Sequence, residues 1–172
     1  METLMDRTKR PILWTTVAAV VVLAAVGLYL FQPWRLFTSN RVDEAAPVAT
    51  DQRRVTTEPL ATGSFVSHEH ETSGSVAVQP LTDGKANLRL TDLRTSDGPA
   101  LHVWLSDQPV EQDGGGNLDD GDHLDLGDLK GNEGNQNYAI PAGTDLDRFS
   151  TVTIWCERFS VSFGAAELRQ SS

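Results

Sequence analysis

The feature that most constrains this chain is a run of twenty uncharged, mostly apolar residues at positions 12–31. At 1.5 Å per residue, a helix of that length spans about 30 Å, which is the thickness of the hydrocarbon core of a bilayer. Trp14 lies near one end of the run and Tyr29 and Trp34 lie near the other, where amphipathic rings favour the membrane interface. The run therefore predicts a transmembrane helix over residues 12–31.

The basic residues around this run predict its orientation. Arg7, Lys9 and Arg10 precede it, and fewer basic residues follow, the nearest being Arg35. Because cytoplasmic flanks carry the excess of lysine and arginine, residues 1–11 are expected to form a cytoplasmic tail. We expect a single-pass protein of the plasma membrane, with its amino terminus inside and the rest of the chain outside.

A cleaved signal peptide is the competing interpretation of the same segment. The apolar core of a signal peptide is usually about 7–15 residues long and ends at a small-x-small cleavage site. This run is longer, and Pro33 and Trp34 follow it with no such site nearby. The pattern favours an uncleaved anchor, and a mature amino terminus near residues 46–50 would contradict it.

Residues 32–61 have the composition of a juxtamembrane linker. They carry prolines, scattered threonines and charges of both signs, with no sustained apolar period. Such a segment is too poor in apolar residues to bury a core of its own.

From residue 62 to about residue 170 the hydrophobic period changes to two, which is typical of half-buried strands. The alternating runs lie at 76–79, 86–91, 101–105, 151–157 and 161–163, with glycine-containing turn signals between them. We expect an all-β domain, an antiparallel β-sandwich of five to eight short strands, preceded by a single transmembrane helix and a linker. The absence of alternating helices argues against a dinucleotide-binding fold.

The β region is strongly acidic. From Thr62 onward it carries eighteen aspartates and glutamates against seven lysines and arginines, a net charge of −11. A surface of this sign repels phosphate backbones, so the sequence predicts no nucleic-acid partner. Solubility, cations and basic proteins remain as explanations of the charge.

Cys156 is the only cysteine, so the chain cannot form an intramolecular disulfide. Strand alternation places it on the same face as Val152 and Ile154. Two interpretations remain open. Cys156 is either a small buried hydrophobic residue or a redox-active thiol whose pKa is tuned by a neighbour such as Arg158.

A second candidate site is the pair His68 and His70. On a strand, these rings would emerge from one face about 7 Å apart, so they are a weak candidate pair of metal ligands. With Cys156 they would make the His₂Cys set that electron-transfer copper uses. The alternative is two solvent-exposed histidines before a turn.

The glycine-rich acidic segment 107–125 offers many carboxylates, as calcium sites do, but no register matches an EF-hand. A solvated loop is the simpler interpretation. No motif in the chain implies a cofactor, and no Gly-x-Ser-x-Gly accompanies its serines and histidines. The sequence leaves catalysis open and does not favour an autonomous enzyme.

Several longer motifs occur in an order that resembles one family, the electron-transfer DM-thirteen domain. The matching stretches are 70–78 (HETSGSVAV), 98–106 (GPALHVWLS), 126–138 (LGDLKGNEGNQNY) and 152–168 (VTIWCERFSVSFGAAEL). The resemblance covers about residues 62–168. It implies a β-rich extracytoplasmic domain and a redox role centred on the cysteine that matches Cys156.

Two function hypotheses follow from these observations. The first is a membrane-tethered extracytoplasmic accessory domain in electron transfer, which exchanges electrons with another protein through Cys156. The alternative is a non-enzymatic cell-surface module that binds a protein, a glycan or a metal, with Cys156 as a structural residue.

Within the motif at 126–138, the glycines predict a tight turn flanked by strands. We expect the side chains of residues 135–137 to hydrogen-bond backbone across a loop that Tyr138 anchors.

Overall fold

The computed structural model describes residues 6–32, 38–47, 58–81, 84–112 and 114–171. Two compact units make up the chain, residues 1–34 and residues 35–172. Their elements are α1 (Asp6–Phe31), β1 (Arg41–Asp43), β2 (Ala61–Ser64), β3 (Val66–Ser67), β4 (Ser73–Pro80), β5 (Ala86–Arg94), β6 (Leu101–Ser106), β7 (His123–Asp128), β8 (Glu133–Ile140), β9 (Thr151–Cys156), β10 (Val161–Glu167) and β11 (Arg169–Gln170).

The first unit consists of the helix α1, in which Leu13–Phe31 is long and apolar enough to cross a membrane. Large apolar side chains such as Leu23 and Tyr29 are mostly exposed to solvent on this helix, at 70% and 74%. A helix that is apolar on all sides needs an apolar environment. A membrane anchor and a signal sequence both meet this description.

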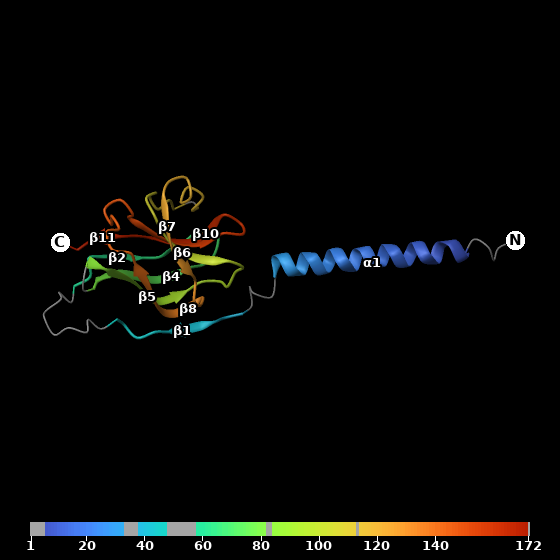
Figure 1. Ribbon diagram of the computed structural model, residues 1–172, viewed down its shortest axis with the longest axis horizontal. Coiled ribbons are helices and arrows are strands. Elements are labelled where there is room, and N and C mark those ends of the chain that lie inside the picture. Colours follow the sequence, from blue (N-terminus) through green and yellow to red (C-terminus); the bar gives the residue numbers. More distant parts are fainter. Residues whose placement is uncertain (1–5, 33–37, 48–57, 82–83, 113, 172) are drawn as a thin grey trace. The chain divides into compact units, whose positions relative to one another are not determined.

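The strands of the second unit form two sheets, which Figure 1 shows as two layers. One sheet has the strand order β1-β8-β5-β4-β2-β11, and the other has the order β3-β10-β9-β6-β7. The pairing is antiparallel throughout except between β1 and β8. The predicted fold class, an antiparallel sandwich after a single apolar helix, is confirmed.

The core lies between the two sheets and follows from the alternation of side chains along the strands. In the six-strand sheet, Val78, Leu88 and Leu90 are fully buried, and in the five-strand sheet Val103 and Ile154 are fully buried opposite them. Along each strand of the five-strand sheet, the side chains between these buried ones point away from the core, toward the outer face of the sheet.

A second apolar cluster covers that outer face of the five-strand sheet. Trp104 of β6, Trp155 of β9 and Ala165 of β10 pack there against Leu118, which is fully buried. Leu118 belongs to the acidic segment between β6 and β7. The interpretation of that segment as a solvated loop was therefore wrong for its centre, because Leu118 anchors it to the two tryptophans.

The segment that the composition assigned to the linker contains a strand. β1 pairs in parallel with β8, with Val42 opposite Gly134, and Figure 1 shows it along that edge of the domain. The carboxylate of Glu44 accepts hydrogen bonds from Lys130 Nζ at 2.8 Å and from the backbone N–H of Asn137 at 2.7 Å. These bonds fix residues just after the helix to the β domain.

Residues 135–137 lie within β8, and their side chains bond backbone groups as expected. The Tyr138 hydroxyl accepts the backbone N–H of Lys130 across the turn between β7 and β8, so the expected anchoring by Tyr138 is confirmed. Gln136 donates to the carbonyl of Gly131 at 2.6 Å, and Asn137 donates to the carbonyl of Ala45 at 2.9 Å. Polar side chains thus occur on both faces of β8, so its sequence does not show the alternation of apolar and polar residues that marks the other strands.

Candidate functional site

Cys156 ends β9, the central strand of the five-strand sheet, and points into the core. Its side chain is 0% exposed and belongs to the same apolar cluster as Val152 and Ile154. The thiol donates a hydrogen bond to the carbonyl oxygen of Pro99 at a sulfur–oxygen distance of 3.2 Å. The predicted face of Cys156 is therefore the observed one.

Burial raises the pKa of the Cys156 thiol above its ordinary value, and smaller contributions from the backbone N–H groups of Phe159 and Arg158 oppose that rise. Removing the charged form from water disfavours the thiolate. Since the thiolate is the reactive form, the closed structure keeps Cys156 in its unreactive, protonated state at neutral pH.

A turn at residues 97–100 covers the thiol. Its Gly98 packs so closely on Phe163 that an added Cβ would lie 2.9 Å from the ring. Ala100 has a positive φ of 59°, which is unfavourable for a residue with a side chain. Residues 97, 98 and 100 also line a surface cleft of about 470 Å³. The turn therefore lies between the buried thiol and an open cleft.

On the opposite face of the same sheet, three aromatic rings form a stack. Trp155, which directly precedes Cys156, stacks on Trp104 with ring centroids 4.9 Å apart. Trp104 stacks in turn on the exposed ring of His123 at 4.0 Å. The residue next to the thiol is thus connected through aromatic contacts to the surface.

The glycine-rich acidic segment folds over this face and is held by backbone contacts. Ser106 Oγ donates to the carbonyl of Leu118 at 2.8 Å, and Thr151 Oγ1 donates to the carbonyl of Gln108 at 2.7 Å. Gly115 lies against His68 and Ser162, where a Cβ would have no room. Gly115 therefore serves close packing, whereas an added Cβ at Gly114 or Gly116 would meet nothing within 4 Å.

His68 helps to hold that segment, and both its ring nitrogens are engaged. Nε2 lies 3.0 Å from the carbonyl oxygen of Glu111, and Nδ1 lies 2.7 Å from Ser162 Oγ. A carbonyl only accepts, so Nε2 carries the proton and Nδ1 accepts from the serine hydroxyl. Burial lowers the pKa of His68, which is consistent with this neutral form.

The Ser162 hydroxyl next to a histidine has the chemistry of a nucleophile and its base. Ser162 is only 1% exposed, however, and its oxygen also lies 2.8 Å from Thr153 Oγ1 in the interior. A substrate has no access to it in this structure. The arrangement is a buried polar network that fixes β9, β10 and the overlying segment.

His70, the other histidine of the predicted pair, packs its ring on Phe163 with centroids 3.8 Å apart. Burial lowers the pKa of His70 as well. Among the described residues, the one group of three His, Cys, Asp or Glu side chains that could hold an ion includes neither His68 nor His70. Their role as metal ligands stays a prediction.

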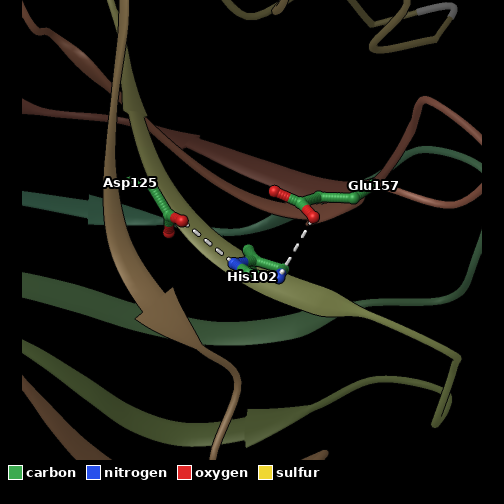
Figure 2. Close-up of side chains that lie close together, drawn as sticks. All are labelled: His102, Asp125 and Glu157. Carbon is green, nitrogen blue, oxygen red and sulfur yellow. Dashed lines mark hydrogen bonds and ion pairs between the residues drawn. The ribbon is translucent and has the colours of Figure 1, made fainter.

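That group lies on the outer face of the five-strand sheet, around His102 of β6. The ring of His102 has Asp125 of β7 on one side and Glu157, just after β9, on the other, as Figure 2 shows. Nδ1 lies 3.1 Å from Asp125 Oδ2, and Nε2 lies 3.5 Å from Glu157 Oε2 and 3.3 Å from Asp128 Oδ1. Three carboxylates thus surround one imidazole.

An irregularity in the pairing of β6 with β7 creates this grouping. His102 is opposite Asp128, but Trp104 is opposite Asp125, so β7 has one residue more than β6 over this interval. The extra residue brings both aspartates to the same side of the sheet. Gly127 adopts a positive φ of 112° there, and its N–H donates to Asp125 Oδ1 at 2.8 Å.

The family model described as Electron transfer DM13 matches residues 64–168. This match covers more than half of the chain, and it contains Cys156, His102 and the three carboxylates around His102. The chain belongs to the electron transfer DM13 family. No curated protein and no solved structure matched it in the same comparisons.

The DM13 match begins at the end of β2 and ends between β10 and β11. It therefore covers both layers of the sandwich, whereas α1 and β1 lie before it. The resemblance inferred from the motifs is confirmed, and with it a redox-related role at the level of the family.

Sequence reasoning missed the His102 group in this DM13 domain. His102 and Glu157 are 55 positions apart, and they become neighbours only because β6 pairs with β9 in one particular register. The sequence held one indication of this group. The alternation of apolar and polar residues along β6 and β9 predicts that His102 and Glu157 both point to the outer face of the sheet.

Proposed function

We propose that this protein is a membrane-tethered, extracytoplasmic electron-transfer domain in which Cys156 is the redox-active group. The thiol would lose its proton and exchange electrons with a redox group of a partner protein. The observation that carries the proposal is the position of the chain's one cysteine, in the central strand of a DM13 domain and directly beneath a cleft-lining turn.

The same proposal assigns α1 as an uncleaved signal anchor in the plasma membrane, with the acidic β domain outside. The length and composition of Leu13–Phe31 support a membrane span. The pairing of β1 with β8 supports retention, since cleavage near residues 46–50 would separate β1 from the rest of the domain.

Reaction at Cys156 requires the protein to open locally. The thiol is fully buried, and its raised pKa keeps it protonated. Displacing the turn at residues 97–100 would break the hydrogen bond to Pro99 and connect the sulfur to the neighbouring cleft. The turn would then act as a gate that limits reaction to partners able to displace it.

Complete burial also favours a second candidate function. A cysteine with 0% exposure and a raised pKa is what a structural, apolar residue would show. In that case the domain is a non-enzymatic cell-surface binding module, and the DM13 fold supplies the surface while Cys156 supplies packing.

Thiol alkylation in the full chain, solubilised in detergent, separates the two functions. The rate is measured at increasing urea concentrations, and the free energy of opening at Cys156 is compared with the free energy of global unfolding. For a gated redox thiol, we expect opening to require less free energy than unfolding and to depend weakly on urea. If opening at Cys156 and global unfolding have the same free energy and the same urea dependence, the result favours a structural role for Cys156.

The reference for the intrinsic alkylation rate is a thiol at an exposed position. Asp119→Cys in a Cys156→Ser background provides it, because Asp119 lies on the exposed part of the acidic segment. Cys156→Ser alone is the control for labelling at other groups. Electron exchange with a soluble one-electron oxidant should also disappear in Cys156→Ser, whereas an unchanged rate would exclude the thiol.

A further inference from the structure

The ring nitrogens of His102 face only acceptors among the contacts described above. Asp125 Oδ2 is within hydrogen-bond distance of Nδ1, at 3.1 Å. An ionised carboxylate cannot donate, so this contact requires the proton on Nδ1. In the neutral imidazole, Nε2 then carries a lone pair, and that lone pair faces the oxygens of Asp128 and Glu157.

A lone pair that faces two carboxylates is unfavourable unless a cation lies between them. The ring of His102 is held there by the strands on both sides, and its side chain is only 15% exposed. Asp125 cannot easily turn away, because its other oxygen accepts the N–H of Gly127. A metal ion bound between Nε2 and these carboxylates would satisfy the lone pair and both oxygens.

The distances around Nε2 fit a metal ion. Bonds of about 2.0–2.2 Å in a tetrahedral site place ligand atoms roughly 3.3–3.6 Å apart. Nε2 lies 3.3 Å from Asp128 Oδ1 and 3.5 Å from Glu157 Oε2. One ligand atom each from His102, Asp125 and Glu157 lie within 4.8 Å of one another. Asp128 is not in this group, so its side chain, which is 89% exposed, must turn toward Glu157 to complete a site around Nε2.

We propose that His102 Nε2, Glu157 and Asp128 bind a divalent transition-metal ion such as Zn²⁺, and that Asp125 orients the imidazole by accepting its Nδ1–H. A carboxylate behind a ligating histidine is the usual support of such sites. The mixture of one imidazole nitrogen with carboxylate oxygens favours a transition metal over calcium, which takes oxygen ligands.

The carboxylates leave room for an exogenous ligand on the ion. The side chains of Glu157 and Asp128 are 48% and 89% exposed, so the outer side of the site is open to solvent. Three protein ligands leave a tetrahedral ion with one further position. The site lies on the opposite face of the sheet from Cys156, so this proposal does not rest on the thiol.

The test uses the full chain in detergent, without a histidine tag. Binding of Zn²⁺ is measured by calorimetry, and Co²⁺ is added as a spectroscopic probe of low-symmetry coordination. We expect one ion per chain, and we expect His102→Asn, Glu157→Gln and Asp128→Asn each to weaken Zn²⁺ binding at least tenfold. The positioning variant Asp125→Asn should also weaken binding, by roughly 10–100-fold, and alter the Co²⁺ spectrum.

Two variants serve as matched controls. Asp119→Asn removes one exposed carboxylate elsewhere, and His70→Asn removes a histidine of the other predicted metal pair; both should bind Zn²⁺ as the unaltered chain does. Thermal unfolding of each variant verifies the fold. Unchanged affinity in His102→Asn or Glu157→Gln would overturn the proposal, as would loss of binding in His70→Asn. No binding at all would also overturn the proposal.

Discussion

At the scale of single residues, two buried polar side chains next to the turn between β7 and β8 hydrogen-bond to each other and to the backbone. Gln136 is fully buried, yet its amide donates to the carbonyl of Gly131 at 2.6 Å and its Oε1 accepts from the Tyr138 hydroxyl at 2.8 Å. Tyr138 in turn accepts the backbone N–H of Lys130 at 3.0 Å. Paired in this way, buried polar groups cost little and help to specify one register of β8.

We expect Tyr138→Phe to destabilise the domain by roughly 1–3 kcal/mol at neutral pH. The substitution removes the hydroxyl, so the Lys130 N–H and Gln136 Oε1 each lose one hydrogen bond. Urea unfolding of the full chain in detergent measures the change. Tyr29→Phe is the matched control, since Tyr29 is 74% exposed on α1. Equal stability of the two variants would contradict this account.

The same residue makes the stability depend on alkaline pH. Burial is the largest cause that raises the pKa of Tyr138 from 10.0 to about 12. Between those two values the folded state binds more protons than the unfolded state, so stability falls as the pH rises, by up to about 3 kcal/mol in total. Below pH 10 this contribution is fully present. The slope between pH 10 and 12 should be smaller in Tyr138→Phe.

Residue-level predictions from the sequence succeeded where only strand parity was needed. The face of Cys156 followed from its distance to Ile154, two positions away. The partners of His68, by contrast, are Ser162 and the carbonyl of Glu111, which come from distant segments. No local sequence pattern predicts these contacts of His68, because they depend on how the segment between β6 and β7 folds over the sheet.

At the scale of elements, the strands that the sequence predicted are those with one apolar face, such as β4, β5 and β9. β7 and β8 were expected only as the strands that flank a turn within residues 126–138, since glycine and polar residues interrupt their apolar alternation. β1 was not expected from the sequence. It is three residues long, and its attachment depends on the side chains of Asn135 and Asn137 in β8 and of Asn132 just before β8.

Glu44 should control how firmly β1 is attached. Its carboxylate bonds to Lys130 and to the N–H of Asn137, and the Lys130 hydrogen bond is the largest cause that lowers the pKa of Glu44. We expect Glu44→Gln to accelerate amide hydrogen exchange at the Glu44 N–H about two- to fivefold, because a partly exposed pair of this kind contributes roughly 0.5–1 kcal/mol.

The amides of β9 serve as the internal reference and should exchange as before, and Glu58→Gln is the matched control for loss of an exposed glutamate. Because the pKa of Glu44 is lowered in the folded state, its contribution is present above the unfolded value of 4.5 and is lost as the pH falls through the folded value. Acidification should therefore loosen β1 in the unaltered chain and have less effect in Glu44→Gln.

At the scale of the whole molecule, the chain combines an apolar helix with an acidic β domain. Composition was sufficient to separate these two parts, because a long uncharged run and a period-two pattern are incompatible within one element. Composition did not reveal β1, which precedes the expected β domain in the sequence and pairs with β8.

The proposed topology can be measured on intact cells with a membrane-impermeant maleimide. The variant with Asp119→Cys and Cys156→Ser carries one exposed thiol in the β domain, and we expect it to be labelled without permeabilisation. Cys156→Ser alone is the control and should remain unlabelled. Labelling only after permeabilisation would contradict an external domain, and a mature amino terminus near residues 46–50 would contradict the anchor.

The docking of β1 changes how far the β domain can travel from the end of α1. A tether of residues 32–61 could extend to about 100 Å, whereas the nine residues between Phe31 and Arg41 permit at most about 35 Å. With α1 in a membrane, a docked β1 would confine the domain to a thin layer above the lipid headgroups. A partner in that layer would meet the domain at a high effective concentration, and a partner beyond it would be reached only after β1 detaches.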